Sequence, residues 1–422
     1  MGRSISAMGV VAGVVVCIAA SATAQNQVFN GSFAKNLRGW VQEPYVLWSP
    51  VDAHGLTSSG SVLVVNTFQM IAQGVEQCIA GPTIIPGNRY TFGGTMRIPS
   101  GQATTGWAAV GLRWYAQPAC GGDPLSEQPR ASVSVADGTF HTVGQASVVA
   151  PAGAASAEFV AYATKVEAGG VFLAYLDDLN FGPADTTAAT PPEIFVPTGA
   201  HLIGYGGTNW RTDAELYNPT QGSVSFRMDL LKRDQANVTP LRMVDAVPAG
   251  TSKRFSDVVF SNFGFSGAAA LRVTPSSGAL AVTSRTYNQT TNGTYGQYVP
   301  GIPDYDAVLF GEEARLTQLT HDVATTSGYR TNIGFVNAVD MPITIEIKLL
   351  TSRGDVLGTL TYAMQPYEFK QIDKIFQKVT SNAVADGLAI VRTTTVGGRF
   401  FAYASVIDNA TGDPICVQPA SF

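Results

Sequence analysis

Residues 223–230, Ser-Val-Ser-Phe-Arg-Met-Asp-Leu, alternate polar and apolar side chains, and residues 343–349, Ile-Thr-Ile-Glu-Ile-Lys-Leu, do the same. A period of two places successive side chains on opposite faces of a β-strand. Gly, Pro, Asn and Asp clusters punctuate such runs about every eight to twelve residues, a spacing typical of β-sandwiches. The fold class predicted from these runs is therefore all-β.

The second half of the chain repeats this pattern. Residues 210–218 align with residues 329–337 at one constant spacing, and residues 255–260 align with residues 371–376 after a short deletion. The order of the matching segments holds over almost a whole module, although few residues are identical. Such self-similarity is typical of tandem copies of one structural unit. We therefore predict two tandem repeated β-sandwich modules.

A small, polar and Pro-rich segment precedes this pair. Residues 183–192 read Pro-Ala-Asp-Thr-Thr-Ala-Ala-Thr-Pro-Pro, as expected of a semi-extended linker. Four of the five Trp residues lie before it, so the two sides of the segment differ in composition. The predicted parts are, in order, a signal peptide at 1–24, a first β-sandwich at 25–183, the linker at 184–193, and the two modules at 194–310 and 311–422.

The N-terminus has the three parts of a secretory signal peptide. Arg3 precedes an apolar run over residues 7–20, and residues 22–24, Ala-Thr-Ala, form a small-residue cleavage site. The alternative, a transmembrane anchor, needs about 20 apolar residues, more than this run offers. We expect cleavage after Ala24, a secreted, extracellular or cell-surface location, and no membrane span in the mature chain.

Three cysteines remain after cleavage, and two of them fall in the first predicted domain. Because oxidising compartments favour disulfides, Cys78 and Cys120 are predicted to pair. Closing a loop of this length stabilises the fold by about 3–4 kcal/mol in the loop-entropy model. Cys416 is left over, either as a small buried side chain or as one partner of an intermolecular bond.

The overall composition describes a globular chain with real cores and no basic character. Hydrophobic residues make up 45% of the chain and charged residues 14%, with 26 Lys and Arg against 31 Asp and Glu. A nucleic-acid binder usually presents a strongly basic face. We therefore expect no nucleic-acid partner.

No catalytic motif is recognisable in the chain. The four histidines, at positions 54, 141, 201 and 321, are scattered singly, and no zinc-protease motif, nucleophile elbow or phosphate loop occurs. A glycosidase needs only two suitably separated carboxylates, which leaves that class open. The favoured interpretation is a non-catalytic protein.

Two motifs mark the ends of the first domain: residues 30–33, Asn-Gly-Ser-Phe, near its start and residues 177–181, Asp-Asp-Leu-Asn-Phe, at its end. With these motifs the domain resembles the galactose-binding-like jelly-roll carbohydrate-binding modules of families four, nine and twenty-two. The resemblance covers residues 26–183 and implies a jelly-roll fold and carbohydrate binding. Residues 195–422 resemble tandem modules of secreted bacterial proteins of unknown activity, which imply no chemistry.

The same resemblance implies one cofactor, a structural calcium ion near the paired termini. Asp178 is the candidate ligand, but Ser32 and Ala34 stand where the family carries acidic residues. Calcium takes six to eight oxygen ligands, several of them carboxylates. The alternative is that Asp177 and Asp178 cap a turn or face solvent.

Residues 107–115, Trp-Ala-Ala-Val-Gly-Leu-Arg-Trp-Tyr, supply the candidate sugar-binding site. Strand alternation places the apolar even-numbered positions on one face and Trp107, Arg113 and Tyr115 on the other. Aromatic rings stack on sugar faces while polar groups bind hydroxyls. We predict that these three residues bind a saccharide, with Tyr45 and Trp48 expected at the rim. The alternative is that Trp107 covers a sheet edge.

Three functions follow in order of preference. The first is a secreted, non-catalytic protein whose N-terminal module binds a polysaccharide or other glycan. The second is a structural or adhesive surface protein whose modules act as protein contacts or spacers. The third is a hydrolase with an unrecognised site.

Overall fold

The computed structural model describes residues 26–57, 59–80, 84–184 and 191–421 of the chain. Almost all of its regular structure is antiparallel β-sheet, which confirms the predicted fold class. The predicted signal peptide and most of the predicted linker lie outside the described residues. No helix in the described part of the chain is long and apolar enough to span a membrane.

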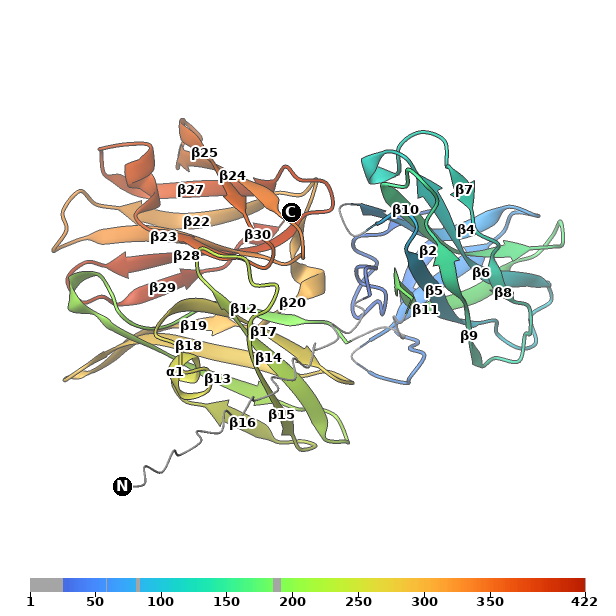
Figure 1. Cartoon of the computed structure of the whole chain (residues 1–422), viewed down its shortest axis with the longest axis horizontal. Coiled ribbons are helices and arrows are strands. Elements are labelled where there is room, and N and C mark those ends of the chain that lie inside the picture. Colours follow the sequence, from blue (N-terminus) through green and yellow to red (C-terminus); the bar gives the residue numbers. More distant parts are fainter. Residues whose placement is uncertain (1–25, 58, 81–83, 185–190, 422) are drawn as a thin grey trace, which may run out of the picture.

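The N-terminal domain is a sandwich of two sheets, which we call sheet A and sheet B (Figure 1). Sheet A contains, in spatial order, β1 (Val41–Gln42), β4 (Ala72–Ala80), β10 (Ser156–Lys165), β6 (Gly106–Tyr115) and β7 (Ser126–Glu127), with β8 (Ala131–Val133) also paired to β6. Sheet B contains β2 (Val46–Ser49), β3 (Ser61–Asn66), β11 (Phe172–Pro183), β5 (Arg89–Arg97) and β9 (Phe140–Val149). The chain crosses repeatedly between the sheets, for example from β3 in sheet B to β4 in sheet A and then to β5 in sheet B, as in a jelly roll.

Alternating side chains fill the space between the two sheets. On β6, the even positions predicted to face inward, from Ala108 to Trp114, are buried to within 1% of complete burial. The Trp114 ring packs against Tyr90 and Phe181 from sheet B, with ring centroids 5.5 and 6.0 Å away. Trp40, which follows the opening motif, is also buried in this core. The alternation predicted for β6 is therefore confirmed.

The first C-terminal module consists of one long path of strands folded into two layers. Its strands, in spatial order, are β15 (Leu241–Val247), β14 (Val224–Lys232), β17 (Gly267–Pro275), β12 (Ile194–Ile203), β13 (Asn209–Tyr217), β18 (Ala281–Thr290) and β19 (Gly293–Pro300), with β16 (Ser252–Phe255) on β13 and β20 (Ile302–Pro303) on β12. Strand β12 belongs to both layers, because its register shifts between Val196 and Gly199. Such an irregularity bends a strand and lets it turn a corner between layers.

The second C-terminal module has two separate sheets. One contains β21 (Val308–Leu309), β28 (Arg399–Asp408), β23 (Tyr329–Asn337) and β26 (Phe369–Ile372), with β29 (Pro414–Val417) on β28. The other contains β25 (Val356–Met364), β24 (Ile343–Thr351), β27 (Val384–Thr393), β22 (Ala314–His321) and β30 (Ala420–Ser421). The chain enters this module between β20 and β21, slightly before the expected boundary at residue 310.

The described helices are short. They are α1 (Val258–Ser261), η1 (Pro118–Cys120), η2 (Tyr205–Gly207), η3 (Asp304–Asp306) and η4 (Ile375–Lys378). Helices α1 and η4 occupy equivalent places, each directly after a short strand that pairs with β13 or β23.

Equivalent side chains make equivalent bonds in the two modules, which confirms the tandem repeat. The buried amide of Asn218 donates to two carbonyl oxygens at 2.7 and 2.8 Å, and the amide of Asn337 does the same at 2.8 and 2.8 Å. Ala214 pairs with Phe255 on β16, and Ile333 pairs with Ile372 on β26. Phe255 is thus equivalent to Ile372, so the sequence alignment that matched residue 255 with residue 371 is wrong by one position.

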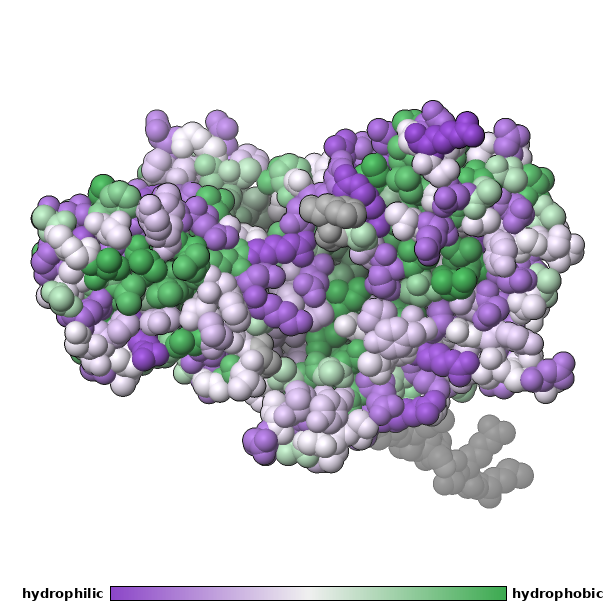
Figure 2. Space-filling view, turned by 180° about the vertical axis from the view of Figure 1, so that it is seen from behind, coloured by the Kyte–Doolittle hydropathy of each residue, from purple (hydrophilic) through white to green (hydrophobic). Residues whose placement is uncertain are grey.

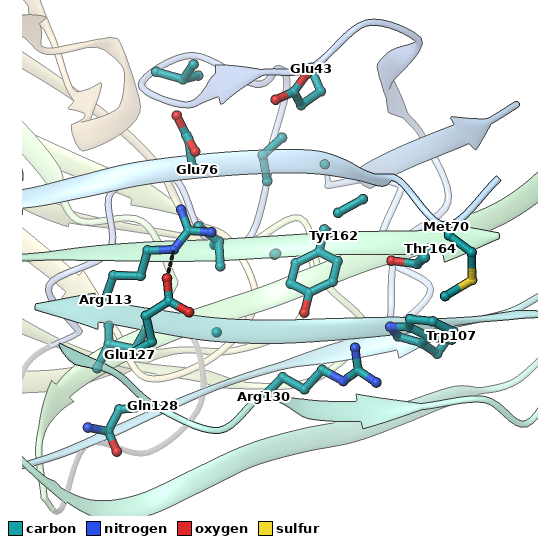
Figure 3. A pocket seen from close by; sticks show the side chains of 18 residues that line it. Glu43, Met70, Glu76, Trp107, Arg113, Glu127, Gln128, Arg130, Tyr162 and Thr164 are labelled. Atoms are coloured by element: carbon teal, nitrogen blue, oxygen red, sulfur yellow. Dashed lines mark ion pairs between the residues drawn. The ribbon is translucent and has the colours of Figure 1, made fainter. Parts of the chain in front are cut away.

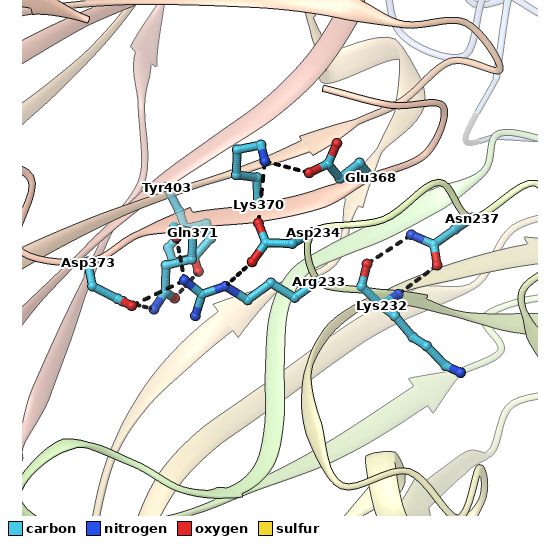
Figure 4. A network of polar contacts seen from close by, with 9 residues as sticks. All are labelled: Lys232, Arg233, Asp234, Asn237, Glu368, Lys370, Gln371, Asp373 and Tyr403. Carbon is cyan, nitrogen blue, oxygen red and sulfur yellow. Dashed lines mark hydrogen bonds and ion pairs between the residues drawn. The ribbon is translucent and has the colours of Figure 1, made fainter. Parts of the chain in front are cut away.

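The two modules share a buried apolar seam. Phe195 from the first and Phe401 from the second pack at a ring-centroid distance of 4.8 Å. Beside this seam, Arg233 donates to the carbonyl oxygen of Gln371 (2.6 Å) and pairs with Asp373 (3.1 Å), while Lys370 pairs with Asp234 at 3.3 Å (Figure 4). The two C-terminal modules therefore pack together as one unit.

The jelly-roll domain docks on this unit through its opening segment. Arg38 donates to the carbonyl oxygens of Tyr305 (3.0 Å) and Ala307 (2.6 Å) and forms an ion pair with Glu312. The guanidinium of Arg399 lies 4.8 Å from the centre of the Phe29 ring.

Seen from behind, the jelly-roll domain lies at left and carries a large hydrophobic area on this face (Figure 2).

Candidate functional site

The outer face of sheet A carries an open groove of about 670 Å³. It crosses the strands, from the β7–β8 segment over β6, β10 and β4 to β1 at the sheet edge (Figure 3). Its labelled lining side chains are Glu43, Met70, Glu76, Trp107, Arg113, Glu127, Gln128, Arg130, Tyr162 and Thr164. A volume of this size is typical of small-molecule sites.

Small residues make the groove possible. Gly111 lies in its floor on β6 and pairs with Val160 on β10, and Gly74 lies on β4, paired with Tyr162. A Cβ on Gly74 would lie 2.0 Å from the carbonyl oxygen of Ala161, so only glycine fits there. A Cβ on Gly111 would meet only the Val160 side chain, at 3.1 Å. The Val160 side chain is therefore the one neighbour that limits the space above Gly111.

One wall of the groove is a charged cluster around Arg113. Its guanidinium donates to Glu158 at 3.0 Å and pairs with Glu127 at 3.1 Å. The hydroxyl of Tyr115 donates to the same Glu158 oxygen at 2.9 Å. Burial, and next the bond to Glu158, raise the pKa of Tyr115 above its usual value. These bonds fix the direction of the guanidinium.

The other wall is formed by Trp107 at the start of β6. The guanidinium of Arg130 lies 4.6 Å from the centre of the indole ring. The indole Nε1 is buried and has no hydrogen-bond partner among the described residues. Arg130 thus holds one face of the ring, and Met70 lies beside it at the groove (Figure 3).

Strand β10 supplies groove residues that the sequence analysis missed. Tyr162 stands in the middle of the groove, between the Arg113 wall and the Trp107 wall, and Thr164 lies next to Trp107 (Figure 3). Glu158, Val160, Tyr162 and Thr164 share the outward face of this strand. The same alternation that identified β6 could have identified these positions.

Carboxylates lie along the β4 and β1 side. Burial, followed by the nearby charge of Glu158, raises the pKa of Glu76 above its usual range. Glu43 lines the groove next to β1, and its backbone N–H donates to the Gly74 carbonyl at 3.0 Å. The groove therefore offers aromatic rings, two guanidiniums and several carboxylate acceptors to a ligand.

The predicted saccharide residues are only partly brought together. Trp107 and Arg113 both line the groove, whereas Tyr115 is buried and supports Glu158 from the side. The placement of Trp48 at the rim is wrong: it lies in β2 of sheet B, and its indole donates to the Phe33 carbonyl at 2.8 Å. The chain passes from β1 in sheet A to β2 in sheet B, so Tyr45 lies on the connection between the sheets and Trp48 lies within the strand of sheet B.

The predicted calcium ligand does not lie in a suitable donor set. Asp178 is paired with His54 at 2.8 Å, and the Asp177 carboxylate accepts from the backbone of Ala53 (2.8 Å) and Asp178 (2.7 Å). Within the described residues, no three His, Cys, Asp or Glu side chains group as metal ligands. These residues cap a turn, in which Asp178 has a positive φ of 50°.

The predicted disulfide is confirmed. Cys78 on β4 and Cys120 in η1 are bonded, with a sulfur–sulfur distance of 2.03 Å. The bond joins the end of β4 to the loop that follows β6, beside the Arg113 wall. Cys416 is the free cysteine of the described chain, and burial raises the pKa of its thiol to about 11.

Two solved structures are similar to this chain. One is the C-terminal family 22 carbohydrate-binding module of Clostridium thermocellum Xyn10B, with 19% identity, 37% of this chain and 94% of that chain covered, and a TM-score of 0.27. The other is the N-terminal tandem of two family 22 modules from Paenibacillus barcinonensis Xyn10C, with 11% identity, 95% and 98% coverage, and a TM-score of 0.28. No protein-family model and no curated protein matches the chain.

Proposed function

We propose that the groove on sheet A binds a polysaccharide chain and that the protein acts outside the cell as a non-catalytic carbohydrate-binding protein. The observation that carries this proposal is the groove itself, in which small floor residues leave room between Trp107 and Arg113, with Tyr162 between them. Rings of this kind stack on the C–H faces of sugars, and fixed polar groups bind their hydroxyls.

The charges of the groove favour a neutral glycan. Its lining includes three carboxylates, from Glu43, Glu76 and Glu127, against the guanidiniums of Arg113 and Arg130. Arg113 is neutralised by Glu127 and Glu158. A polyuronate would therefore meet net negative charge, which opposes binding.

Affinity electrophoresis of the full mature chain tests the proposal. The gels contain soluble xylan, barley β-glucan, galactomannan or polygalacturonate, and we expect a neutral polymer to slow migration while polygalacturonate does not. Migration unchanged by every polymer contradicts carbohydrate binding. Slowing by polygalacturonate alone contradicts the charge argument.

A hydrolase is the alternative that the groove itself suggests. Glu76 has a raised pKa and lies near Glu158, and glycosidases use such unequal carboxylates as acid and base. Glu158, however, is held by Arg113 and Tyr115, which leaves it acting as a scaffold. We therefore expect no release of reducing ends from any bound polymer, and release that is abolished by Glu76→Gln would favour the hydrolase instead.

A structural or adhesive role is the second alternative, and the packed C-terminal pair favours it for that part of the chain. The Phe195–Phe401 seam and the Arg233 network make a rigid unit suited to act as a spacer.

A secreted location fits the Cys78–Cys120 disulfide, because such bonds persist in oxidising compartments. Thiol labelling of Cys78 and Cys120 tests this link to an oxidising compartment. Both thiols should resist labelling in protein exported to the periplasm and react in protein made in the cytosol.

A further inference from the structure

An exposed aromatic pair lies at the edge of the jelly roll where the groove ends. The rings of Tyr45 and Phe68 are 6.4 Å apart, and 59% and 40% of the two residues' surfaces are exposed. Tyr45 lies between β1 of sheet A and β2 of sheet B, and Phe68 lies between β3 of sheet B and β4 of sheet A. Both connections pass around the same edge of the sandwich.

The pair is continuous with the groove along both connections. Glu43 and Met70 line the groove, and each lies two residues from one ring, Glu43 before Tyr45 and Met70 after Phe68. Both connections are pinned to sheet A: the Glu43 N–H donates to Gly74 (3.0 Å) and the Met70 N–H donates to Lys165 (2.8 Å). A chain leaving the groove past β1 therefore meets these rings next.

The backbone of Tyr45 is held in an unusual conformation. Its φ is 64°, in the left-handed region that a bulky side chain rarely adopts. The Val65 N–H donates to the Tyr45 carbonyl at 3.0 Å and helps to hold it there. This backbone conformation and the bond to Val65 fix the position of Tyr45 on the connection.

We propose that the Tyr45–Phe68 pair is an additional binding site for a polysaccharide chain that runs out of the groove over β1. The inference rests on the proposed function of the groove and adds the length of its ligand. The protein binds the interior of long polymers, whose sugars occupy the groove and the aromatic pair together. A short oligosaccharide fills the groove alone.

The test compares long and short ligands on the full mature chain. Soluble xylan and barley β-glucan are the polymers, and each is paired with its own tetrasaccharide in calorimetric titrations. Tyr45→Ala and Phe68→Ala are expected to weaken polymer binding by about threefold to tenfold, the range for one stacked ring, and to leave tetrasaccharide binding unchanged. Leu47→Ala removes an equally exposed apolar side chain from β2 and serves as the control, with no expected change.

Each outcome decides a different point. Equal weakening of polymer and tetrasaccharide overturns the inference, because the variants then act on the groove. Unchanged polymer binding in Tyr45→Ala, together with loss of binding in Trp107→Ala, overturns the inference and leaves the proposed function standing. Failure of the unaltered chain to bind either polymer overturns both. A change of sedimentation in Tyr45→Ala without any change in polymer binding assigns the rings to self-association instead.

Discussion

The two outer faces of the jelly roll share one motif and differ in shape. On sheet A, Arg130 stacks on Trp107 with a distance of 4.6 Å to the ring centre, and on sheet B, Arg97 stacks on Tyr175 with a distance of 5.3 Å. The first pair borders the groove of about 670 Å³ on sheet A. An aromatic ring beside an arginine is therefore not what makes a binding face.

The difference lies in the neighbours of the ring. On sheet A, Gly111 and Gly74 leave the centre of the face low. On sheet B, large side chains form a row across the outer face, because each lies directly opposite the next on the neighbouring strand. The row contains Leu47, Leu63, Tyr175, Arg97 and Phe140. The absence of bulk on sheet A thus accounts for its groove.

The largest expected effect concerns the inner side of β6, which packs in the core between sheet A and sheet B. Trp114→Ala empties a fully buried site between the sheets and is expected to cost about 3–5 kcal/mol of unfolding free energy. Denaturation followed by tryptophan fluorescence measures this, because four of the five Trp residues lie in the jelly roll. Trp107→Ala, on the outer side, should cost clearly less, because this ring is only partly buried and its main contact is the Arg130 guanidinium. The reverse order would show that the two sides of β6 are assigned wrongly.

The second effect concerns Asp177, a fully buried carboxyl group on β11 of sheet B. Burial, with the Asp178 charge next, raises the pKa of Asp177 from 3.8 to about 8. Between these values the unfolded carboxyl ionises while the folded one keeps its proton, so the contribution of Asp177 to stability is complete below its unfolded pKa and falls as the pH rises through about 8. The loss is at most about 1.4 kcal/mol per pH unit.

Denaturant titrations between pH 5 and pH 8 check this slope. Asp177→Asn removes the titrating group and should give a flatter profile, although it starts from a lower stability because an amide accepts fewer backbone bonds. Identical slopes in the Asp177→Asn variant and the unaltered chain would contradict the prediction.

The third effect tests the importance of empty space on sheet A. Gly111→Phe places a ring in the groove floor and is expected to weaken polysaccharide binding by at least about tenfold, equivalent to 1.4 kcal/mol. The melting temperature should change little, because a Cβ at this position meets only the Val160 side chain. Gly111→Ala, which adds only one carbon, is the control and should bind nearly normally. Unimpaired binding by the Phe variant would show that the ligand lies elsewhere.

The smallest effect compares the two stacked rings directly. Trp107→Ala should weaken binding about tenfold, because stacking contributes about 0.5–1.5 kcal/mol beyond the buried area. Tyr175→Ala removes the equivalent ring from sheet B and should leave the affinity unchanged within about twofold. Parallel titrations with one polymer provide the measurement. Equal losses in the two variants would remove the distinction between the faces.

Part of the site followed from local alternation. The nine residues from Trp107 to Tyr115 form one strand, and period-two alternation correctly separated its buried face from its outer face. The same rule applied to β10 predicts that Glu158 and Tyr162 share an outer face, but the sequence does not show that β10 lies beside β6. Residues 158 and 113 become partners through a long-range strand pairing.

The failures have the same origin. Trp48 follows Tyr45 by only three residues, yet Tyr45 lies on the connection between the sheets while Trp48 lies in β2 of sheet B, where its indole bonds to Phe33. The alignment of the two repeats was wrong by one residue because the sequence does not show how many residues the second module lacks in the preceding loop. Register is set by hydrogen-bonded neighbours, which a local pattern does not identify.

The sequence by itself determined the all-β class, the tandem repeat, the disulfide pair and the two sides of β6. Each of these depends on a period, a repeated order or a small count of residues, which are local or compositional properties. Only the tertiary structure decided that the groove lies on sheet A, that Tyr162 and Glu76 belong to it, and that Tyr45 and Phe68 meet at its end. A hollow forms where small residues on neighbouring strands coincide, and that coincidence is a product of strand order and register, to which residues far apart in the chain contribute equally.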